Sequence, residues 1–374
     1  MDIFVIYTFI LSTIIGLLTI PSIVIISKKK RLFDTPNSRK VHTNDVSRLG
    51  GVSFLPAIFF SLCAMIGIRN ITGNDISPLY QLSFNTEFMF FTAGVMLLFF
   101  TGLADDLIGV GYKNKFVVQI ISAFFLSISS LYIDNIGGLF GLHAISDVGG
   151  IIFTTLAIVL IVNAYNLIDG VDGLCSGLTL IAVSTFTIWF WINGLYAYAM
   201  IGCAVLGCVT VFFFYNVTGR RMKVFMGDAG SLVLGFVICY LGLKFIDMNE
   251  NNMYGMSNGL VVTLSIVFIP VFDTFRVFTE RIAAGHSPFH PDKTHIHHYL
   301  LALGFTHFQS TSIILIAAVV VMAANFIFAN INITILFLSD ILFGLVFLCF
   351  IPKYFVKRQI KINIKNKIIK EVAK

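Results

Sequence analysis

The chain has 374 residues, of which 57% are hydrophobic and only 12% are charged, and its mean hydropathy is +0.91. Soluble globular domains carry about 25% charged residues, so this composition excludes that class and indicates a polytopic membrane protein. The formal net charge of +6 comes from basic residues that lie in short segments between long apolar runs. The six cysteines form no C-x-x-C pair, which is typical of small buried side chains in such a protein.

The apolar runs predict eleven transmembrane helices, because one span of the hydrocarbon core takes about 20 residues. The first run is longer than the core of a signal peptide and ends in a basic cluster instead of a cleavage site, so we expect a retained first helix. The sequence therefore predicts an all-α polytopic fold with helices at 3–27, 50–68, 87–104, 116–133, 150–167, 176–193, 197–215, 230–246, 259–277, 312–329 and 332–351.

Basic residues determine the predicted orientation. Of the 25 Lys and Arg residues, 22 lie in five polar segments, namely 28–48, 105–115, 216–229, 278–311 and the tail 352–374. Eleven spans place all five segments on one side, and the positive-inside rule makes that side the cytoplasm. We therefore expect the N-terminus outside, the C-terminus in the cytoplasm, and one integral-membrane domain over residues 1–351. The basic tail is more typical of a contact with anionic lipid headgroups than with nucleic acid.

Two adjacent carboxylates follow the third apolar run. Asp105 and Asp106 come after some fifteen nearly uncharged residues, and a carboxylate at the centre of a membrane helix costs roughly 2.5–3.5 kcal/mol. Taken alone, such a pair is more often the interfacial end of a helix than a site.

The fifth apolar run closes with N-A-Y-N-L-I-D-G-V-D-G-L, in which polar side chains recur every three residues. These side chains share one face for as long as the helix lasts, and they are Asn163, Asn166, Asp169 and Asp172. Gly170 and Gly173 then allow the backbone to turn. An Asn in a membrane helix usually bonds a neighbouring helix, so this spacing is also compatible with a purely structural role.

Three further polar groups follow in the chain. Asp228 lies between glycines in V-F-M-G-D-A-G-S, where the backbone can approach a ligand closely. Asp273 and Arg276 have the i, i+3 spacing of a structural ion pair. The segment 290–300 contains the histidines His295, His297 and His298, which taken alone could be a solvated loop or an incidental zinc site.

The coincidence of these groups favours a binding site. Purely structural polar residues would scatter over both membrane faces, whereas here separate segments place carboxylates, amides and imidazoles on the same predicted face. Clustered carboxylates with few cations attract a divalent ion, and Mg²⁺, or Mn²⁺ in its place, suits carboxylate and phosphate oxygens. The predicted cytoplasmic site segments are 28–48, 105–115, 168–175, 216–229 and 278–311.

Carboxylates for Mg²⁺ beside Lys, Arg and His side chains suit the binding of a diphosphate. Phosphoryl transfer needs mainly positioning and charge neutralisation, which such a set can supply. The predicted location at a membrane surface indicates a lipid phosphate as one substrate and a soluble nucleotide derivative as the other.

Five blocks in order resemble the polyprenyl-phosphate N-acetylhexosamine-1-phosphate transferases, whose sister branch contains the phospho-N-acetylmuramoyl-pentapeptide transferases. The blocks are FDTPNSRKVH....SRLGG (33–51), GLADDLIGV (102–110), NAYNLIDGVDGL (163–174), VFMGDAGS (224–231) and HPDKTHIHH (290–298). The resemblance implies transfer of a sugar phosphate, most simply N-acetylglucosamine-1-phosphate, from a UDP-sugar to undecaprenyl phosphate. UMP would be released, and the product would initiate cell-surface polysaccharide synthesis at the cytoplasmic face of a bacterial membrane. A homodimer is compatible with the resemblance.

The resemblance also implies roles for individual residues. Catalytic roles are implied for Asp105, Asp106, Asn166 and Asp169, and metal binding for Asp105, Asp169 and Asp228. Substrate contacts are implied for Asp172, His295, His297, His298, Lys115, Lys40, His42 and Arg48. The division of roles between the two adjacent aspartates stays open. Because a phosphate monoester with a second pKa near 6 is largely ionised at pH 7, we favour positioning over base catalysis.

The sequence leaves two alternative functions to be compared with this one. Ile296 splits the histidines into H-I-H-H, which resembles the simple-hexosamine branch more than the peptidoglycan branch. A lipid or nucleotide-sugar transporter would need polar groups near the midplane and on both faces, and the predicted outer loops 69–86, 134–149 and 247–258 offer few. The identity of the acetamido sugar and the glycan pathway stay open.

Overall fold

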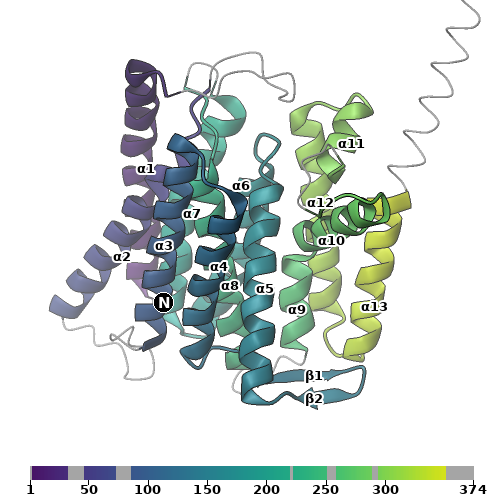
Figure 1. Cartoon of the computed structure of the whole chain (residues 1–374). Helices are drawn as coiled ribbons and strands as arrows, with labels where there is room; N and C mark the ends of the chain where they lie inside the picture. Colours follow the sequence, from purple (N-terminus) through teal and green to yellow (C-terminus); the bar gives the residue numbers. More distant parts are fainter. Residues whose placement is uncertain are drawn as a thin grey trace, which may run out of the picture.

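The protein is a helical bundle with one small sheet, as seen in the computed structural model (Figure 1). The structure describes residues 2–32, 46–72, 86–219, 222–250, 258–288 and 294–350. Lys40, His42 and the basic tail 352–374 lie outside the described residues, so their predicted roles stay predictions.

The helices follow one another with short connections. They are α1 (Ile3–Lys30), α2 (Phe54–Ile71, preceded by the 3₁₀ turn Gly50–Ser53), α3 (Thr86–Ile108), α4 (Tyr112–Ile128), α5 (Asp147–Leu167), α6 (Leu174–Ile192), α7 (Tyr196–Thr218), α8 (Asp228–Glu250), α9 (Gly259–Ile266), α10 (Phe268–Ala283), α11 (Ile296–Ala302), α12 (His307–Ile327) and α13 (Ile333–Gly344, extended by Leu345–Phe350). Strands β1 (Asn135–Leu139) and β2 (Leu142–Ala144) pair antiparallel as a hairpin.

The all-α prediction is confirmed, and each predicted span coincides with a helix or a pair of helices. Among the described residues, nine helical segments are long and apolar enough to cross a membrane, and the pair α9–α10 makes a tenth if it is counted as one. Helix α4 has only 17 residues, about 25 Å of helix. The hairpin β1–β2 was not predicted, because its five- and three-residue strands are too short to give a clear alternating pattern.

The ninth predicted span, 259–277, is not one straight helix. It is bent by 72° between α9 and α10. Pro270 explains the break: it has no N–H to bond the carbonyl of Ile266, the last residue of α9, and its ring would clash with that carbonyl in a continuous helix. Helix α10 therefore leaves the direction of α9 near the middle of the bundle (Figure 1).

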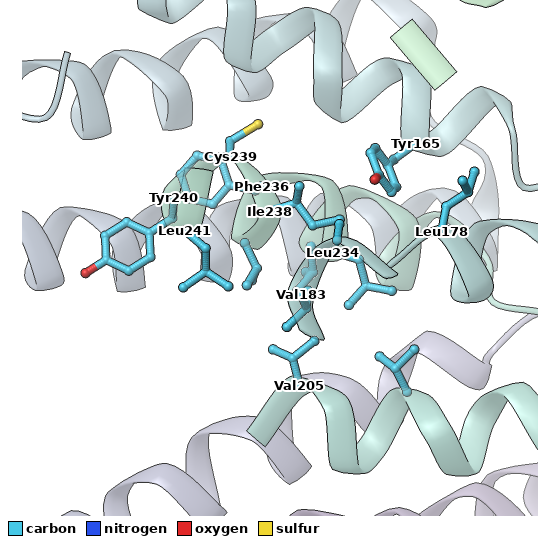
Figure 2. Packing of buried hydrophobic residues seen from close by; sticks show 14 of the residues in the cluster. Tyr165, Leu178, Val183, Val205, Leu234, Phe236, Ile238, Cys239, Tyr240 and Leu241 are labelled. Atoms are coloured by element: carbon cyan, nitrogen blue, oxygen red, sulfur yellow. The ribbon is translucent and has the colours of Figure 1, made fainter. Parts of the chain in front are cut away.

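Helix α8 forms the centre of the bundle. Of its apolar span, 94% is buried, against 22% for α1. Figure 2 shows Leu234, Phe236 and Ile238 of α8 in the buried cluster that also contains Tyr165 of α5 and Val183 of α6. Because α8 is surrounded by other helices, its N-terminus at Asp228 is held at the centre of one end of the bundle.

The predicted sidedness of the loops agrees with the fold. In Figure 1 the α5–α6 turn and α11 lie at the upper end, and the hairpin β1–β2 lies at the lower end. Four of the five predicted basic segments have described parts, and these parts follow or precede helix ends at the upper end, since the helices alternate in direction. Residues far apart in the sequence thus meet at this upper end.

Candidate active site at the upper end of the bundle

Asp106 joins α3 to the start of α8. Its Oδ1 accepts a hydrogen bond from the backbone N–H of Asp228 (2.9 Å), and its Oδ2 accepts one from Ala229 (3.0 Å). The first N–H groups of a helix have no partner within the helix, and Asp106 satisfies two of them. Gly227 has φ +72, and a Cβ there would lie 2.5 Å from Asp106 Oδ2, so this junction requires glycine. The geometry therefore gives Asp106 the task of positioning Asp228.

Lys115 connects the other adjacent aspartate to the same centre. Its Nζ lies 3.1 Å from Asp105 Oδ2 and 2.7 Å from Asp228 Oδ2. Asp105 Oδ1 also accepts a hydrogen bond from the N–H of Val110 (2.6 Å). The side chains of these three charged residues are each 20–22% exposed, so they form a cluster that is partly open to solvent. Three predicted site residues from three helices are thus brought together.

The first predicted block pairs with the segment before α8. Phe225 donates its N–H to the carbonyl of Ser47 (2.8 Å), and Gly51 donates to the carbonyl of Met226 (2.8 Å). Ser47 and Val224 form an isolated parallel bridge. This pairing carries the exposed side chain of Arg48 to the neighbourhood of Asp228.

The α5–α6 turn carries Asp169 to the same end. Helix α5 stops at Leu167, so the shared helical face ends before Asp169, and Asp169 and Asp172 lie in the turn that follows. Asn166, still on α5, donates from Nδ2 to Ser231 Oγ of α8 (2.9 Å). Among the residues that the structure describes, none donates a hydrogen bond to the Asp169 carboxylate.

The charge of Asp169 is influenced by the whole cluster. Burial raises the pKa of Asp169 well above its usual range, and the carboxylates of Asp228 and Asp106 raise it further, while Arg48 acts in the opposite direction. An unpaired carboxylate beside other carboxylates is stabilised as an anion only if a cation approaches it. Among the described residues, the effect of the carboxylates on Asp169 therefore outweighs that of Arg48.

Asp172 is already paired. Its Oδ2 lies 2.7 Å from Lys223 Nζ and 3.1 Å from His307 Nδ1. Burial raises the pKa of Asp172, but the contact with His307 and the hydrogen bond from Lys223 outweigh it and leave this pKa below its usual range. Thr311 of α12 also donates to the backbone carbonyl of Asp172 (2.8 Å). These contacts attach the α5–α6 turn to α12.

The histidine motif lies against the α5–α6 turn. The side chain of His297 is only 1% exposed, and a Cβ on Gly170 would lie 2.5 Å from its Nε2. The rings of His295 and His297 are parallel with centroids 5.7 Å apart, and His298 lies beside them at 4.3 Å from His297. Burial lowers the pKa of His297 well below its usual range, and the neighbouring histidines lower it further. Both effects favour the neutral form of the His297 imidazole.

Comparison with known proteins identifies the family. Residues 88–246, from α3 to α8, match glycosyl transferase family 4. The undecaprenyl-phosphate alpha-N-acetylglucosaminyl 1-phosphate transferase of Salmonella typhi is 31% identical over 293 residues, which are 77% of this chain and 74% of that protein. The chain belongs to glycosyl transferase family 4.

Further relatives agree with this assignment. The protein of Escherichia coli K12 with the same name is 29% identical over 297 residues, 78% of this chain and 75% of that protein. The probable undecaprenyl-phosphate N-acetylglucosaminyl 1-phosphate transferase of Bacillus subtilis is 32% identical over 312 residues, 83% of this chain and 81% of that protein. The resemblance that the sequence blocks indicate is thereby confirmed at the level of the family.

The type of ligand atom shows which metal ion the predicted metal-binding residues suit. Asp105, Asp169 and Asp228 present hard carboxylate oxygens, which suit Mg²⁺. Within the described ranges, however, no three His, Cys, Asp or Glu side chains lie close enough together to hold a metal ion. Mg²⁺ takes one or two carboxylates and completes its shell with water and substrate phosphate. The residues therefore fit an ion that binds together with a phosphate substrate better than a closed, protein-only site.

Two site neighbours were missed at the level of the sequence. Lys223 and His307 hold Asp172, but His307 lies 135 positions away from it in the chain and begins a different helix. Lys223 comes shortly before the V-F-M-G-D block, and a cation next to an acidic cluster was the signal that could have identified it. No such signal exists for His307, because only the packing of α12 against the turn brings it there.

Proposed function

We propose that this protein transfers N-acetylglucosamine-1-phosphate from UDP-N-acetylglucosamine to undecaprenyl phosphate and releases UMP. The observation that carries the proposal is the convergence of separate sequence blocks around Asp228, where carboxylates and cations meet at one end of a membrane bundle. The names of the relatives contain the same acceptor, undecaprenyl phosphate, and the same transferred group, N-acetylglucosaminyl 1-phosphate. The product is a polyprenyl diphosphate-linked sugar that can initiate a cell-surface polysaccharide.

The reaction needs no base on the acceptor. An oxygen of undecaprenyl phosphate attacks the β-phosphorus of the UDP-sugar, and the bond from that phosphorus to the bridging oxygen breaks, so UMP leaves with the bridging oxygen. A phosphate monoester with a second pKa near 6 is largely ionised at pH 7. Asp106, whose two oxygens are both bound by the start of α8, therefore acts by positioning Asp228.

Charge neutralisation is the main task of the site. Mg²⁺ bound by one or two of the carboxylates Asp105, Asp169 and Asp228, together with the substrate phosphates, would neutralise the diphosphate and its developing charge. Lys115 and Arg48 lie at the same end and supply fixed positive charge for the two phosphate substrates. The histidine motif beside Gly170 forms the other wall of the site.

The membrane position follows from charge. The described basic segments lie at the end that carries the site, which under the positive-inside rule supports a cytoplasmic location of this end. The proposal therefore has the site face the cytoplasm of a bacterial inner membrane, where nucleotide sugars are available. An apolar cavity of about 330 Å³ lies along α5 between Phe153 and Ile161 and is lined also by α8 and α9. Its lining also includes Ile136 and Leu139 of β1 at the lower end, so the part of a polyprenyl chain that it would hold lies away from the phosphate.

Release of UMP by the purified protein tests the proposal. The protein in detergent is given undecaprenyl phosphate, Mg²⁺ and, in parallel, UDP-N-acetylglucosamine, UDP-N-acetylgalactosamine or UDP-N-acetylmuramoyl-pentapeptide. We expect UMP release with UDP-N-acetylglucosamine and its loss in excess chelator. Release with only the pentapeptide donor would assign the chain to the peptidoglycan branch, and activity that survives the chelator would contradict the metal requirement. Silence with all three donors would contradict the proposed reaction.

A further inference from the structure

Asp273 of the bent helix α10 binds the histidine motif directly. Its side chain is only 1% exposed. Oδ2 lies 2.8 Å from His295 Nδ1, and Oδ1 accepts from Arg276 Nη2 at 2.6 Å. The backbone N–H of Ile296 lies 3.2 Å from Oδ1 and 3.3 Å from Oδ2. One buried carboxylate thus holds the imidazole and the main chain at the start of α11.

Arg276 holds the same segment from the other side. Its Nη2 donates to the carbonyl of Thr294 (2.5 Å) as well as to Asp273. The guanidinium also lies over the ring of Tyr299, 5.4 Å from its centroid. The pair expected to be a structural ion pair is indeed an ion pair, but both of its members also bind residues 294–299. An i, i+3 pair on one helix would not need those additional contacts.

The hydrogen bond to Asp273 determines the chemistry of His295. A carboxylate that accepts from Nδ1 keeps the proton on that nitrogen and leaves Nε2 as the nitrogen that can meet a substrate. The ring of His295 lies parallel to that of His297, which in turn contacts Gly170 next to Asp169. A continuous set of contacts therefore leads from α10 to the turn that carries Asp169.

The bend between α9 and α10 makes this contact feasible. A straight continuation of α9 would send residues 268–283 in another direction, because the two helices differ by 72°. A buried ion pair is by itself weak evidence for stability, so stability alone does not explain a carboxylate at this place. We propose that Asp273 is a positioning residue, which fixes the tautomer and the orientation of His295 in the substrate site.

This inference rests on the proposed function, and a double-mutant cycle tests it. Asp273→Asn, His295→Gln and the double variant are compared with the wild type by kcat/KM for UMP release. Loss of a residue that orients a functional histidine typically costs about 10–100-fold, and we expect this loss for Asp273→Asn in the wild-type background. In the His295→Gln background the same change should cost less than about 3-fold, because the group that it orients is gone.

Equal losses from Asp273→Asn in both backgrounds, or no loss in an active wild-type background, would contradict the positioning role. Glu280→Gln is the matched control, since Glu280 binds Arg276 Nη1 at 3.2 Å but is not a partner of His295. Its kcat/KM should equal that of the wild type.

Folding and function are separated within the same experiment. Gel filtration in detergent checks each variant, because Asp273→Asn leaves the Arg276 charge without its main partner. If that variant aggregates, the cycle is run with Asp273→Glu, which keeps the charge but moves the carboxylate by one methylene, and the same criterion applies. A wild-type protein without UMP release would contradict the proposed function itself, whereas an active wild type with uncoupled losses would contradict only the role of Asp273.

Discussion

The two ends of the α3–α8 pair carry similar clusters with different surroundings. At the upper end, Lys115 lies between Asp105 and Asp228. At the lower end, Lys244 of α8 lies 3.0 Å from Glu87 and 2.9 Å from Asp247. Each cluster has one lysine between two acids and connects α3 to α8, the upper one through Lys115 of α4. They differ in what lies around them.

The lysine of the lower cluster is the more buried of the two lysines, whereas its partner Asp247 is 39% exposed. The Lys244 side chain is 8% exposed, against 21% for Lys115, and the hydroxyl of Tyr240 donates to Glu87 (2.8 Å). At the upper end, Asp169 adds a carboxylate without a hydrogen-bond donor among the described residues. A lysine between two acids therefore does not make a site. The additional carboxylate of Asp169 distinguishes the upper end.

The largest expected effect is that of Asp228→Asn. The substitution removes a carboxylate that accepts from Lys115 at 2.7 Å and that is positioned by Asp106. Metal-assisted charge stabilisation is worth several kcal/mol, so UMP release should fall by about 10³-fold. Steady-state UMP release measures this, with gel filtration as the control for folding. Turnover within a few-fold of the wild type would contradict the role of Asp228.

Gly170→Ala should cost less. A methyl group there would lie 2.5 Å from His297 Nε2, so the buried imidazole must move. A displacement of this size in a positioning group should lower kcat/KM by about 10-fold. Gly67→Ala on α2 is the matched control, because a Cβ at Gly67 meets no atom within 4 Å. Equal kinetics of the two variants would argue against contact of the histidine motif with the site.

The next largest effect is expected on the pH dependence of kcat/KM. Asp169 has a pKa raised by burial and by the carboxylates of Asp228 and Asp106. If the ionised form is needed, activity is lost as pH falls through this raised pKa. Arg48 lowers the pKa of Asp169, so Arg48→Ala should move the acid limb of kcat/KM to higher pH. Arg48→Lys, which keeps the charge, should leave the limb in place. A shift to lower pH with Arg48→Ala would contradict this arrangement.

The smallest effect on activity is expected at the lower cluster. Glu87→Gln removes a charge that binds Lys244 at 3.0 Å and accepts from Tyr240. Weakening these buried contacts should lower the free energy of unfolding by about 1–3 kcal/mol, while kcat/KM stays at the wild-type value. Thermal unfolding in detergent and UMP release measure the two quantities. A loss of turnover without a loss of stability would assign a functional role to the lower end.

The sequence predicted the spans and the site blocks, but only part of their geometry. Long apolar runs and charged loops are local signals, so the helices and the common end of the site blocks followed from them. The bend at Val267 and the hairpin depend on a single proline and on very short strands. The pairing of His307 with Asp172 depends on tertiary packing that no local pattern records. Asp273 was recognised as a partner of Arg276, whereas its contact with His295 needed the fold.

The most direct test of the difference between the two ends compares Asp105→Asn with Asp247→Asn. Each substitution neutralises an acid that binds a lysine, at 3.1 Å for Asp105 and 2.9 Å for Asp247. UMP release from UDP-N-acetylglucosamine with undecaprenyl phosphate and Mg²⁺ is measured for both variants in the same detergent. Asp105→Asn should lose at least about 10²-fold in turnover, and Asp247→Asn should match the wild type. Equal turnover of the two variants would contradict the assignment of the active site to the upper end.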